Sequence, residues 1–464
     1  MNPSDAPQST ARRRRSGARL RRTTYDVIDV AEDGTRRVGF DAVSALTIYL
    51  ALLLLLPSDR VVPGLGDLGA PAVLWGFACF LWWLWHVLSR HQDGPLLLSP
   101  VSIAAWVFVG TVLLSYVFAM MRAIPAEEVL PADRALLRML SFLGVLLVAS
   151  SGITSFDRLQ TLLRRLVLLT GIVALAGIVE FFLRTPIAPM IRIPGLVSGG
   201  GGTADMRGEF LRSSATAIHP LEYATTLSVA FPVALMLALR SAGRTRAAML
   251  LCASLIGFAL VLAGSRSAIV GLVVGTVPLL IVLGVRERIF AVVAGISALA
   301  LVYVAVPGMI GTLRNMFLSA GSDSSILSRT ASLQLIDLLV PLSPWVGRGL
   351  GTFPPSYQIF DNQLVLLMVE VGIIGTAAFV AVYVAAIICV VRCRSHPPDI
   401  AGIAAALAAG CLVALTLSIF FDSFAFPKAF GLLALTPGLC AATWRVAQNF
   451  SLQASLAGGG TDAR

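Results

Sequence analysis

Long apolar stretches follow one another along most of the chain, with short polar segments between them. A helix needs roughly 20 mainly apolar residues to cross the hydrocarbon core of a bilayer. Such stretches occur near residues 38–57, 70–89, 100–121, 135–153, 165–183, 221–239, 247–263, 267–285, 289–306, 363–391, 400–421 and 428–447. The pattern predicts an all-α fold, a polytopic transmembrane helical bundle with about 12 spans.

The composition excludes an ordinary soluble enzyme. Hydrophobic residues make up 57% of the chain and charged residues 13%, with a mean hydropathy of +0.85. Soluble domains contain roughly 45–50% apolar and about 25% charged residues. The lipid bilayer is therefore the first expected partner of this protein.

The basic residues indicate how the chain is oriented. Short cytoplasmic loops attract Lys and Arg, and most of the 35 basic residues share one side of the bundle if the N-terminus is inside. We expect a plasma (inner) membrane protein with a basic cytoplasmic tail at 1–37, a membrane domain at 38–447 and a second cytoplasmic tail at 448–464. The arginine run at 12–15 beside the first span favours anionic lipid over nucleic acid.

Two long loops are expected on the outer face, at about 184–220 and 307–362, and long ordered loops are usually functional. The first contains Arg207 and Arg212 and leads to His219, which opens the next span. Glu222 in the first turn of that span complements the helix dipole. For His219 alone, a structural role at the helix start is favoured over catalysis.

A tight outer turn, GSRS at 264–267, places Arg266 between two long apolar helices. An arginine at this depth can reach the lipid headgroups with its guanidinium group. An ionisable residue beside a span is also a functional candidate. The sequence leaves both interpretations of Arg266 open.

The second long loop carries the remaining candidates. Its segment 325–340 is roughly amphipathic and predicts a helix on the membrane surface with Arg329 near its start. Arg348 lies in the glycine-rich turn that follows. Asp361 and Asn362 directly precede the tenth span, where an aspartate is also a good helix cap.

Glu370 lies two to three turns inside the tenth span as the hydropathy pattern defines it. A carboxylate in that position is costly in lipid, so it is expected to face the protein interior or a water-filled cavity.

Together these residues suggest chemistry on a phosphorylated substrate. Guanidinium groups bind phosphate oxygens in pairs and can stabilise a departing diphosphate. Asp361 is the candidate base for a hydroxyl group. The sequence has no zinc-ligand spacing, ATP-binding loop or Asp-x-Asp motif, so no metal and no cofactor is predicted.

Four motifs in order resemble the O-antigen ligase and O-antigen polymerase superfamily of bacterial polysaccharide assembly. They are LRSSATAIHPLEYA, AGSRSAIVG, SRTASLQLIDLLVPLSPWVGRGLGTF and DNQLVLLMVEVGIIG, within residues 200–380. The resemblance implies a metal-independent glycosyltransferase in cell envelope biogenesis. Its donor would be a polyprenyl-diphosphate-linked glycan, and its acceptor a glycan or another envelope molecule.

The resemblance also implies residue roles. Arginines that match Arg212 and Arg266 hold the donor diphosphate in that family, and Arg329 matches a further recurrent arginine. Ligases of the family typically carry a histidine near the position of Asp361, where this chain has Asp-Asn. An aspartate base resembles what the related shape, elongation and division polymerases use.

Two other classes of function remain open at this point. A transporter or flippase of lipid-linked glycans predicts inverted repeats and broken helices at matching places, and no such repeat is visible in the sequence. A structural partner of an envelope complex predicts that the outer arginines are individually dispensable.

Overall fold

The computed structural model describes residues 40–89, 98–200, 205–207, 210–306, 311 and 335–458. The helices and strands with their bounds are α1 (Ala42–Leu55), β1 (Arg60–Val61), η1 (Gly66–Gly69), α2 (Pro71–Leu88), α3 (Pro100–Met120), α4 (Ala126–Gly152), α5 (Phe156–Leu183), η2 (Ala188–Met190), β2 (Val197–Ser198), β3 (Asp205–Arg207), β4 (Phe210–Arg212), α6 (Pro220–Arg240), α7 (Gly243–Leu262), α8 (Arg266–Val282), α9 (Val285–Ala305), η4 (Val340–Leu342), α12 (Gln363–Glu370), α13 (Gly372–Val391), η5 (Arg392–Ser395), α14 (Pro398–Leu417) and α15 (Pro427–Gly458).

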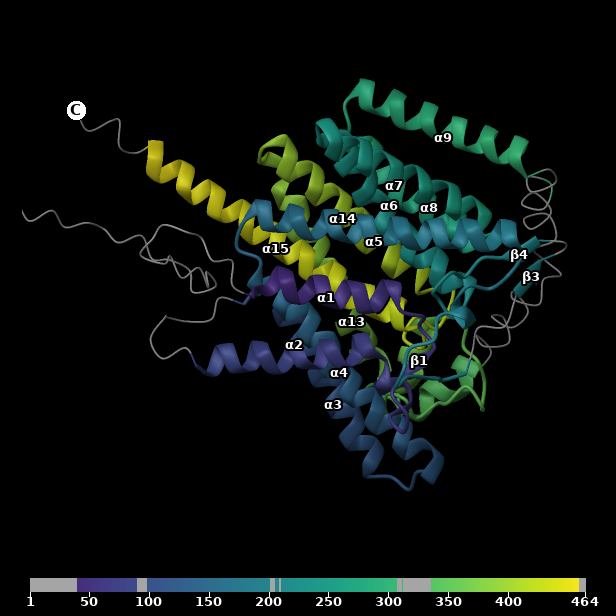
Figure 1. Cartoon of the computed structure of the whole chain (residues 1–464). Coiled ribbons are helices and arrows are strands. Elements are labelled where there is room, and N and C mark those ends of the chain that lie inside the picture. Colours follow the sequence, from purple (N-terminus) through teal and green to yellow (C-terminus); the bar gives the residue numbers. More distant parts are fainter. Residues whose placement is uncertain are drawn as a thin grey trace, which may run out of the picture.

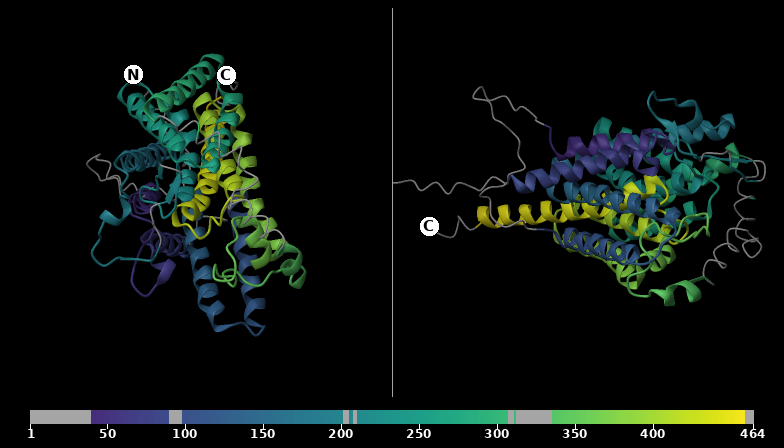
Figure 2. Two further views of the ribbon diagram at one scale, coloured as in Figure 1. Left: turned by 90° about the vertical axis from the view of Figure 1, so that its right-hand side faces the viewer. Right: turned by 90° about the horizontal axis from the view of Figure 1, so that it is seen from below.

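The long helices run roughly parallel to one another, so the bundle has two distinct ends (Figures 1 and 2). One end, here called the loop end, carries the strands. There β1 pairs with β2 and β3 pairs with β4, both antiparallel. The other end, here called the tail end, carries the C-terminal end of α15 (Figure 1).

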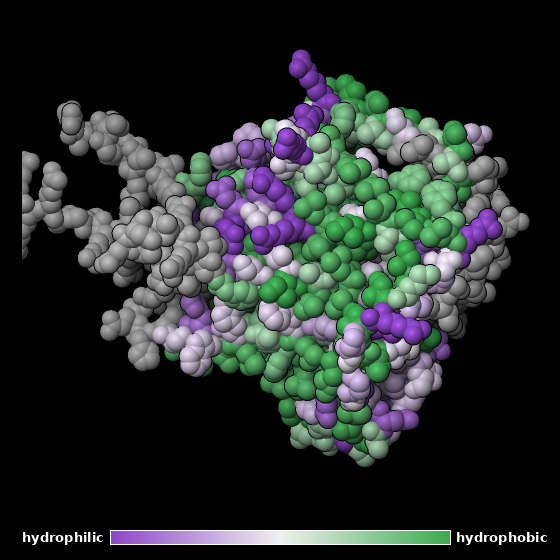
Figure 3. Space-filling view, in the orientation of Figure 1, coloured by the Kyte–Doolittle hydropathy of each residue, from purple (hydrophilic) through white to green (hydrophobic). Residues whose placement is uncertain are grey.

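Every predicted span coincides with a helix or with a pair of consecutive helices. Within the described residues, nine helical segments are long and apolar enough to cross a bilayer, and α1 and α8 are shorter apolar helices. The chain is therefore a multi-pass, all-α membrane protein, while the count of twelve spans stays a prediction. Hydrophobic side chains cover most of the face in Figure 3, with hydrophilic patches toward both ends.

The centre of the bundle is formed by α6 and α15. In each, 89% of the apolar stretch is buried inside the protein, against 28% in α2. Gly271 and Gly275 allow α8 to pack closely against α6. A Cβ on Gly271 would lie 2.5 Å from Ser228 Oγ of α6, and one on Gly275 would lie 3.0 Å from Pro232.

The tenth predicted span, 363–391, is not one continuous helix. It breaks into α12 and α13 at Gly372, which adopts a φ of +70°. The backbone groups at the break are bonded by a distant turn: Gly349 N–H donates to the Glu370 carbonyl at 2.7 Å, and Ile373 N–H donates to the Pro344 carbonyl at 2.8 Å. A distant part of the protein thus supplies hydrogen-bond partners for these backbone groups at the break.

A buried charged cluster joins several connections at the loop end. The Lys428 ammonium group, fully buried, donates to the carbonyls of Leu56 and Thr216 and to Ser58 Oγ. Ser58 Oγ in turn donates to Glu222 Oε1 at 3.1 Å, and the Lys428 backbone N–H donates to the same oxygen at 2.7 Å. Lys428 is the only lysine of the chain. Its three bonds and the opposite charge of Glu222 make burial of the ammonium group tolerable.

Lys428→Met is expected to destabilise the folded protein by about 3 kcal/mol or more. The substitution leaves Glu222 buried without a counter-charge and removes the donor for two carbonyls. The check is thermal unfolding of the purified protein in detergent, with Arg392→Met, an exposed position, as the control. Equal melting midpoints for the two variants would show that the cluster adds little to stability.

Candidate functional site

Asp361 lies at the loop end, directly before α12. Asn362 is the residue that caps this helix, because its side-chain oxygen accepts from the N–H groups of Leu364 at 3.0 Å and Val365 at 3.2 Å. The alternative that Asp361 serves as the helix cap is therefore wrong. The half-buried Asp361 carboxylate is left available for another role.

The start of α12 is fixed against the connection between α14 and α15, residues 418–426. The backbone N–H of Gln363 donates to the Ser418 carbonyl at 2.8 Å, and Gln363 Oε1 accepts from Phe424 N–H at 2.7 Å. Gln363 is fully buried, and its Nε2 donor has no hydrogen-bond partner within the described part of the chain. These bonds hold Asp361 beside the 418–426 connection.

A second carboxylate, Asp422, lies in that connection. Its pKa is raised to about 6, chiefly because burial disfavours the charged form, and the nearby charge of Asp361 acts in the same direction. The N–H of Ala425, which donates to Asp422 Oδ1 at 3.3 Å, and the charge of Arg138 oppose this shift. Asp422 carries no signal in the sequence, because it lies in a short connection between two spans, and only the long loops stand out by their length.

Arg138 of α4 contributes a positive charge beside Asp422. Its guanidinium group donates to the Phe424 carbonyl at 2.6 Å and to Asp67 at 2.9 Å, and lies 4.6 Å from the ring centroid of Phe430. Its side chain is only 11% exposed. Hydropathy placed Arg138 near a span end and so gave no sign of this role. A charge within the apolar helix α4 is the signal that could have found it.

The glycine-rich turn before α12 is held by carboxylates of α4 and α12. Arg348 forms an ion pair with Glu128 of α4 at 3.2 Å, and its carbonyl accepts from Arg122 at 2.9 Å. Glu370 is buried, as its place in the sequence predicted, and its Oε1 accepts from the N–H groups of Gly351 and Phe353. Arg348 and Glu370 thus support the shape of the loop end.

His219 caps α6, because its Nδ1 accepts from Leu221 N–H at 3.1 Å. This hydrogen bond fits the structural role favoured for His219 at the start of the span. Its ring also lies 6.0 Å from the ring of Phe426, which connects the first loop to the 418–426 connection. Glu222 accepts from Ile218 N–H as well as from Lys428, so its role extends beyond the helix dipole.

Three of the four predicted diphosphate-binding arginines lie in described parts of the loop end. Arg212 is in β4, opposite Asp205 of β3, and is followed by Ser213, which donates to the Gly177 carbonyl at 2.8 Å. Arg207 is in β3 opposite Phe210, although only its backbone is described. The half-buried Arg266 begins α8.

The fourth arginine, Arg329, and most of the predicted surface helix 325–340 lie outside the described residues. The described end of that segment packs inward: Leu335, Ile336 and Leu339 contact the small apolar cluster formed by Phe353, Phe360, Val365, Leu366 and Val369.

One comparison with protein families found a match within the chain. The chain is a multi-pass helical membrane protein, and its loop end brings Asp361, Asp422 and Arg138 near one another. Residues 247–380 match the family model described as O-antigen ligase (Wzy_C), so this part of the chain is similar to that family. No curated protein matches the chain significantly.

The match runs from α7 into α13 and contains Arg266 and Asp361. Arg138, Arg212 and Asp422 lie outside it. The O-antigen ligase family implies a glycosyltransferase, and the resemblance recognised in the sequence is confirmed for this segment.

Asp422→Asn is expected to raise stability near neutral pH. The folded state holds a proton on Asp422 up to about pH 6, whereas the unfolded chain loses it near 3.8. Stability therefore falls as pH rises between these values and stays lower above them. The asparagine keeps the acceptor for Ala425 but carries no charge.

The measurement is the melting midpoint at about pH 7.5 and about pH 4.5. The gain of the asparagine variant over wild type should be larger at the higher pH, and the exposed Asp157→Asn should show no such difference. An equal gain in melting midpoint at both pH values would show that burial does not destabilise the charged form of the Asp422 carboxylate.

Proposed function

We propose that the protein transfers or polymerises glycans from a polyprenyl-diphosphate-linked donor at the outer face of the plasma membrane. The observation that carries the proposal is that the segment similar to the O-antigen ligase family contains both Arg266, at the start of α8, and Asp361, at the start of α12. Both helix starts lie at the loop end of the bundle.

The proposed orientation places the loop end outside. Helix ends and connections at the tail end are rich in arginine, as the cytoplasmic side of a membrane protein is. The arginines of these segments are Arg158, Arg164, Arg165, Arg240, Arg244, Arg246, Arg286, Arg288, Arg392, Arg394 and Arg445. Both termini are then cytoplasmic.

Asp361 acts as the general base in the proposed reaction. It takes the proton of an acceptor hydroxyl, whose oxygen attacks the anomeric carbon of the donor sugar from the face opposite the diphosphate. The bond from that carbon to the diphosphate oxygen breaks, and polyprenyl diphosphate leaves with the bonding electrons. The configuration at the anomeric carbon is inverted.

The arginines stabilise the leaving group in this scheme. Arg212 and Arg266, with Arg207 and Arg329, bind the diphosphate oxygens and offset the charge that develops as the bond breaks. The transfer therefore needs no metal ion. A guanidinium group at the start of α8 also lies at the positive end of a helix dipole, which favours an anion there.

Asp361, as the base that deprotonates the acceptor hydroxyl, is expected to be essential for transfer. When a strain that lacks the gene is complemented with Asp361→Asn, turnover should be about 10²–10⁴-fold lower than with the wild-type gene, because the amide cannot take a proton. Lipid-linked glycans are extracted and measured by mass spectrometry, with Asp157→Asn as a control at the tail end. Single repeat units accumulate if the enzyme is a polymerase, and long lipid-linked chains accumulate if it is a ligase.

The proposal fails if no lipid-linked glycan accumulates in the deletion strain, because transport or scaffolding would then explain the protein better. The proposed mechanism fails if Asp361→Asn restores the wild-type glycan profile as fully as the control Asp157→Asn does.

Arg266→Ala should lower transfer by about 10²–10³-fold, as the loss of one electrostatic donor to a developing charge does elsewhere. The measurement is transfer by purified protein in liposomes, with the lipid-linked glycan from the deletion strain as the donor. An unchanged rate would return Arg266 to the role of an interfacial anchor for the headgroup region.

A further inference from the structure

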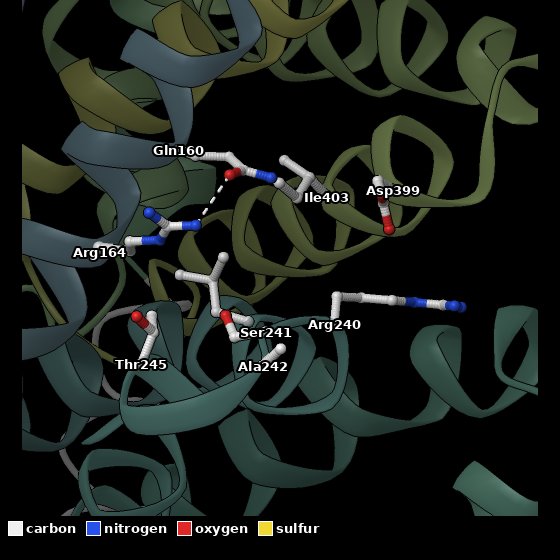
Figure 4. Close-up of a pocket in the computed structure, with 9 residues that line it drawn as sticks. Gln160, Arg164, Arg240, Ser241, Ala242, Thr245, Asp399 and Ile403 are labelled. Atoms are coloured by element: carbon white, nitrogen blue, oxygen red, sulfur yellow. Dashed lines mark hydrogen bonds between the residues drawn. The ribbon is translucent and has the colours of Figure 1, made fainter. Parts of the chain in front are cut away.

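The helix α5 carries polar side chains near both of its ends. At the tail end, Gln160 and Arg164 line a polar cavity of about 240 Å³, and the Arg164 guanidinium group donates to Gln160 Oε1 at 2.9 Å (Figure 4). At the loop end, Glu180 lies in the last turn of the helix and is only 1% exposed. A carboxylate there is costly twice over, because it is buried in a membrane helix and because it lies at the negative end of the helix dipole. Glu180 is therefore a candidate for a functional role.

The Glu180 carboxylate binds the far end of the first long loop. Its Oε1 accepts from the backbone N–H of Ser214 at 3.0 Å and from Ser214 Oγ at 3.3 Å. One residue earlier, Ser213 Oγ donates to the Gly177 carbonyl of α5 at 2.8 Å. The chain thus leaves α5, passes through Arg212 in β4 and returns to the same helix, where these bonds close the loop.

The backbone at this closure is strained. Ala215 has a φ of +50°, in the left-handed region that residues with a Cβ rarely adopt, and it is fully buried. Such conformations persist only where the surrounding structure holds them, and they are concentrated at functional sites. The bonds from Ser214 to Glu180 supply part of this constraint, because they fix the residue directly before Ala215.

The last turn of α5 also contacts the helix that leads to Arg266. Phe181, the neighbour of Glu180, packs with Leu262 near the end of α7, shortly before α8 begins at Arg266. The segment that follows Arg212 and the helix that precedes Arg266 therefore both pack on the same end of α5.

We propose that Glu180 positions Arg212 for the donor diphosphate by fixing the closed end of the first long loop to α5. The inference rests on the proposed function, in which Arg212 binds the diphosphate oxygens. Glu180 acts through the short backbone connection from Arg212 to Ser214, so it is a positioning residue and not a catalytic one. Paired bonds from a guanidinium group to phosphate oxygens need defined geometry, and a displacement of about 1 Å can cost about 10²-fold in rate.

Two conservative substitutions separate the reach of the Glu180 side chain from its charge. Glu180→Asp keeps the negative charge but is one carbon shorter, so its oxygens are drawn away from Ser214. Glu180→Gln keeps the length and an acceptor oxygen but loses the charge. If Glu180 acts by positioning, Glu180→Asp should raise the KM for the donor about tenfold with a smaller change in kcat, and Glu180→Gln should stay within about threefold of wild type.

The measurement is transfer by the purified full-length protein in liposomes at varied concentrations of the lipid-linked glycan from the deletion strain. Asp157→Asn, an exposed acidic position at the other end of α5, is the control and should leave kcat and KM unchanged. Wild-type kinetics in Glu180→Asp would overturn the proposal. A loss in Glu180→Gln as large as that in Glu180→Asp would also overturn it.

A double-mutant cycle tests whether Glu180 acts through Arg212. Arg212→Ala should itself raise the KM for the donor, and adding Glu180→Asp to it should raise the KM little further, because the side chain that Glu180 positions is already gone. If the two effects multiply in full, Glu180 acts elsewhere in the protein and the proposal is wrong.

Hydrogen exchange gives a second readout that needs no activity. Peptides that span Arg212 to Ile218 should exchange faster in Glu180→Asp than in wild type or in Asp157→Asn, because the closure of the loop is weakened. Equal exchange in all three proteins would overturn the proposal. A wild-type protein that transfers no glycan would refute the proposed function and with it the diphosphate role, whereas faster exchange in Glu180→Asp would still support the closure of the loop.

Discussion

The bonds of Lys428 hold the loop end together, and the placement of the candidate site depends on them. Its ammonium group reaches the Leu56 carbonyl, 372 residues away in the chain, and also the Thr216 carbonyl. The first long loop, the end of α1 and the start of α15 are therefore fixed to one another. The 418–426 connection, which precedes α15 directly, is held between His219 on one side and Gln363 on the other. Asp361 is placed by this chain of contacts and not by α12 alone.

The hydropathy pattern predicted where the helices lie because burial in lipid demands long apolar stretches, and this demand is local in sequence. The hydrogen bonds that stabilise the break at Gly372, in contrast, come from residues outside the apolar stretch. The backbone groups at the break are bonded by the turn at 344–349, which lies before the apolar stretch, and no pattern within that stretch reveals this partner. Glu370 marked the place nonetheless, because a carboxylate so near the membrane requires donors from the protein.

The candidate site was predicted only in part, for a related reason. Asp361 and Arg266 stand out because they are charges beside apolar stretches. Asp422 and Arg138 were missed because their meaning depends on the packing of α4 against the start of α15, where Arg138 lies over the Phe430 ring. Whether Asp361 or Asn362 caps α12 is likewise decided by backbone geometry, which the two adjacent residue types cannot reveal.

The position of Arg138 and Asp422 outside residues 247–380 has a consequence for protein engineering. The segment that carries the family's signature is not a self-contained module. Its aspartate lies beside the connection before α15, which Arg138 of α4 contacts through the Phe424 carbonyl, and both of these elements lie outside the matched segment. A chimera that exchanged only the matched segment between two such proteins would bring in the aspartate and Arg266 from one protein. The α4 helix and the 418–426 connection around them would still come from the other. Both flanking regions would have to be exchanged with it.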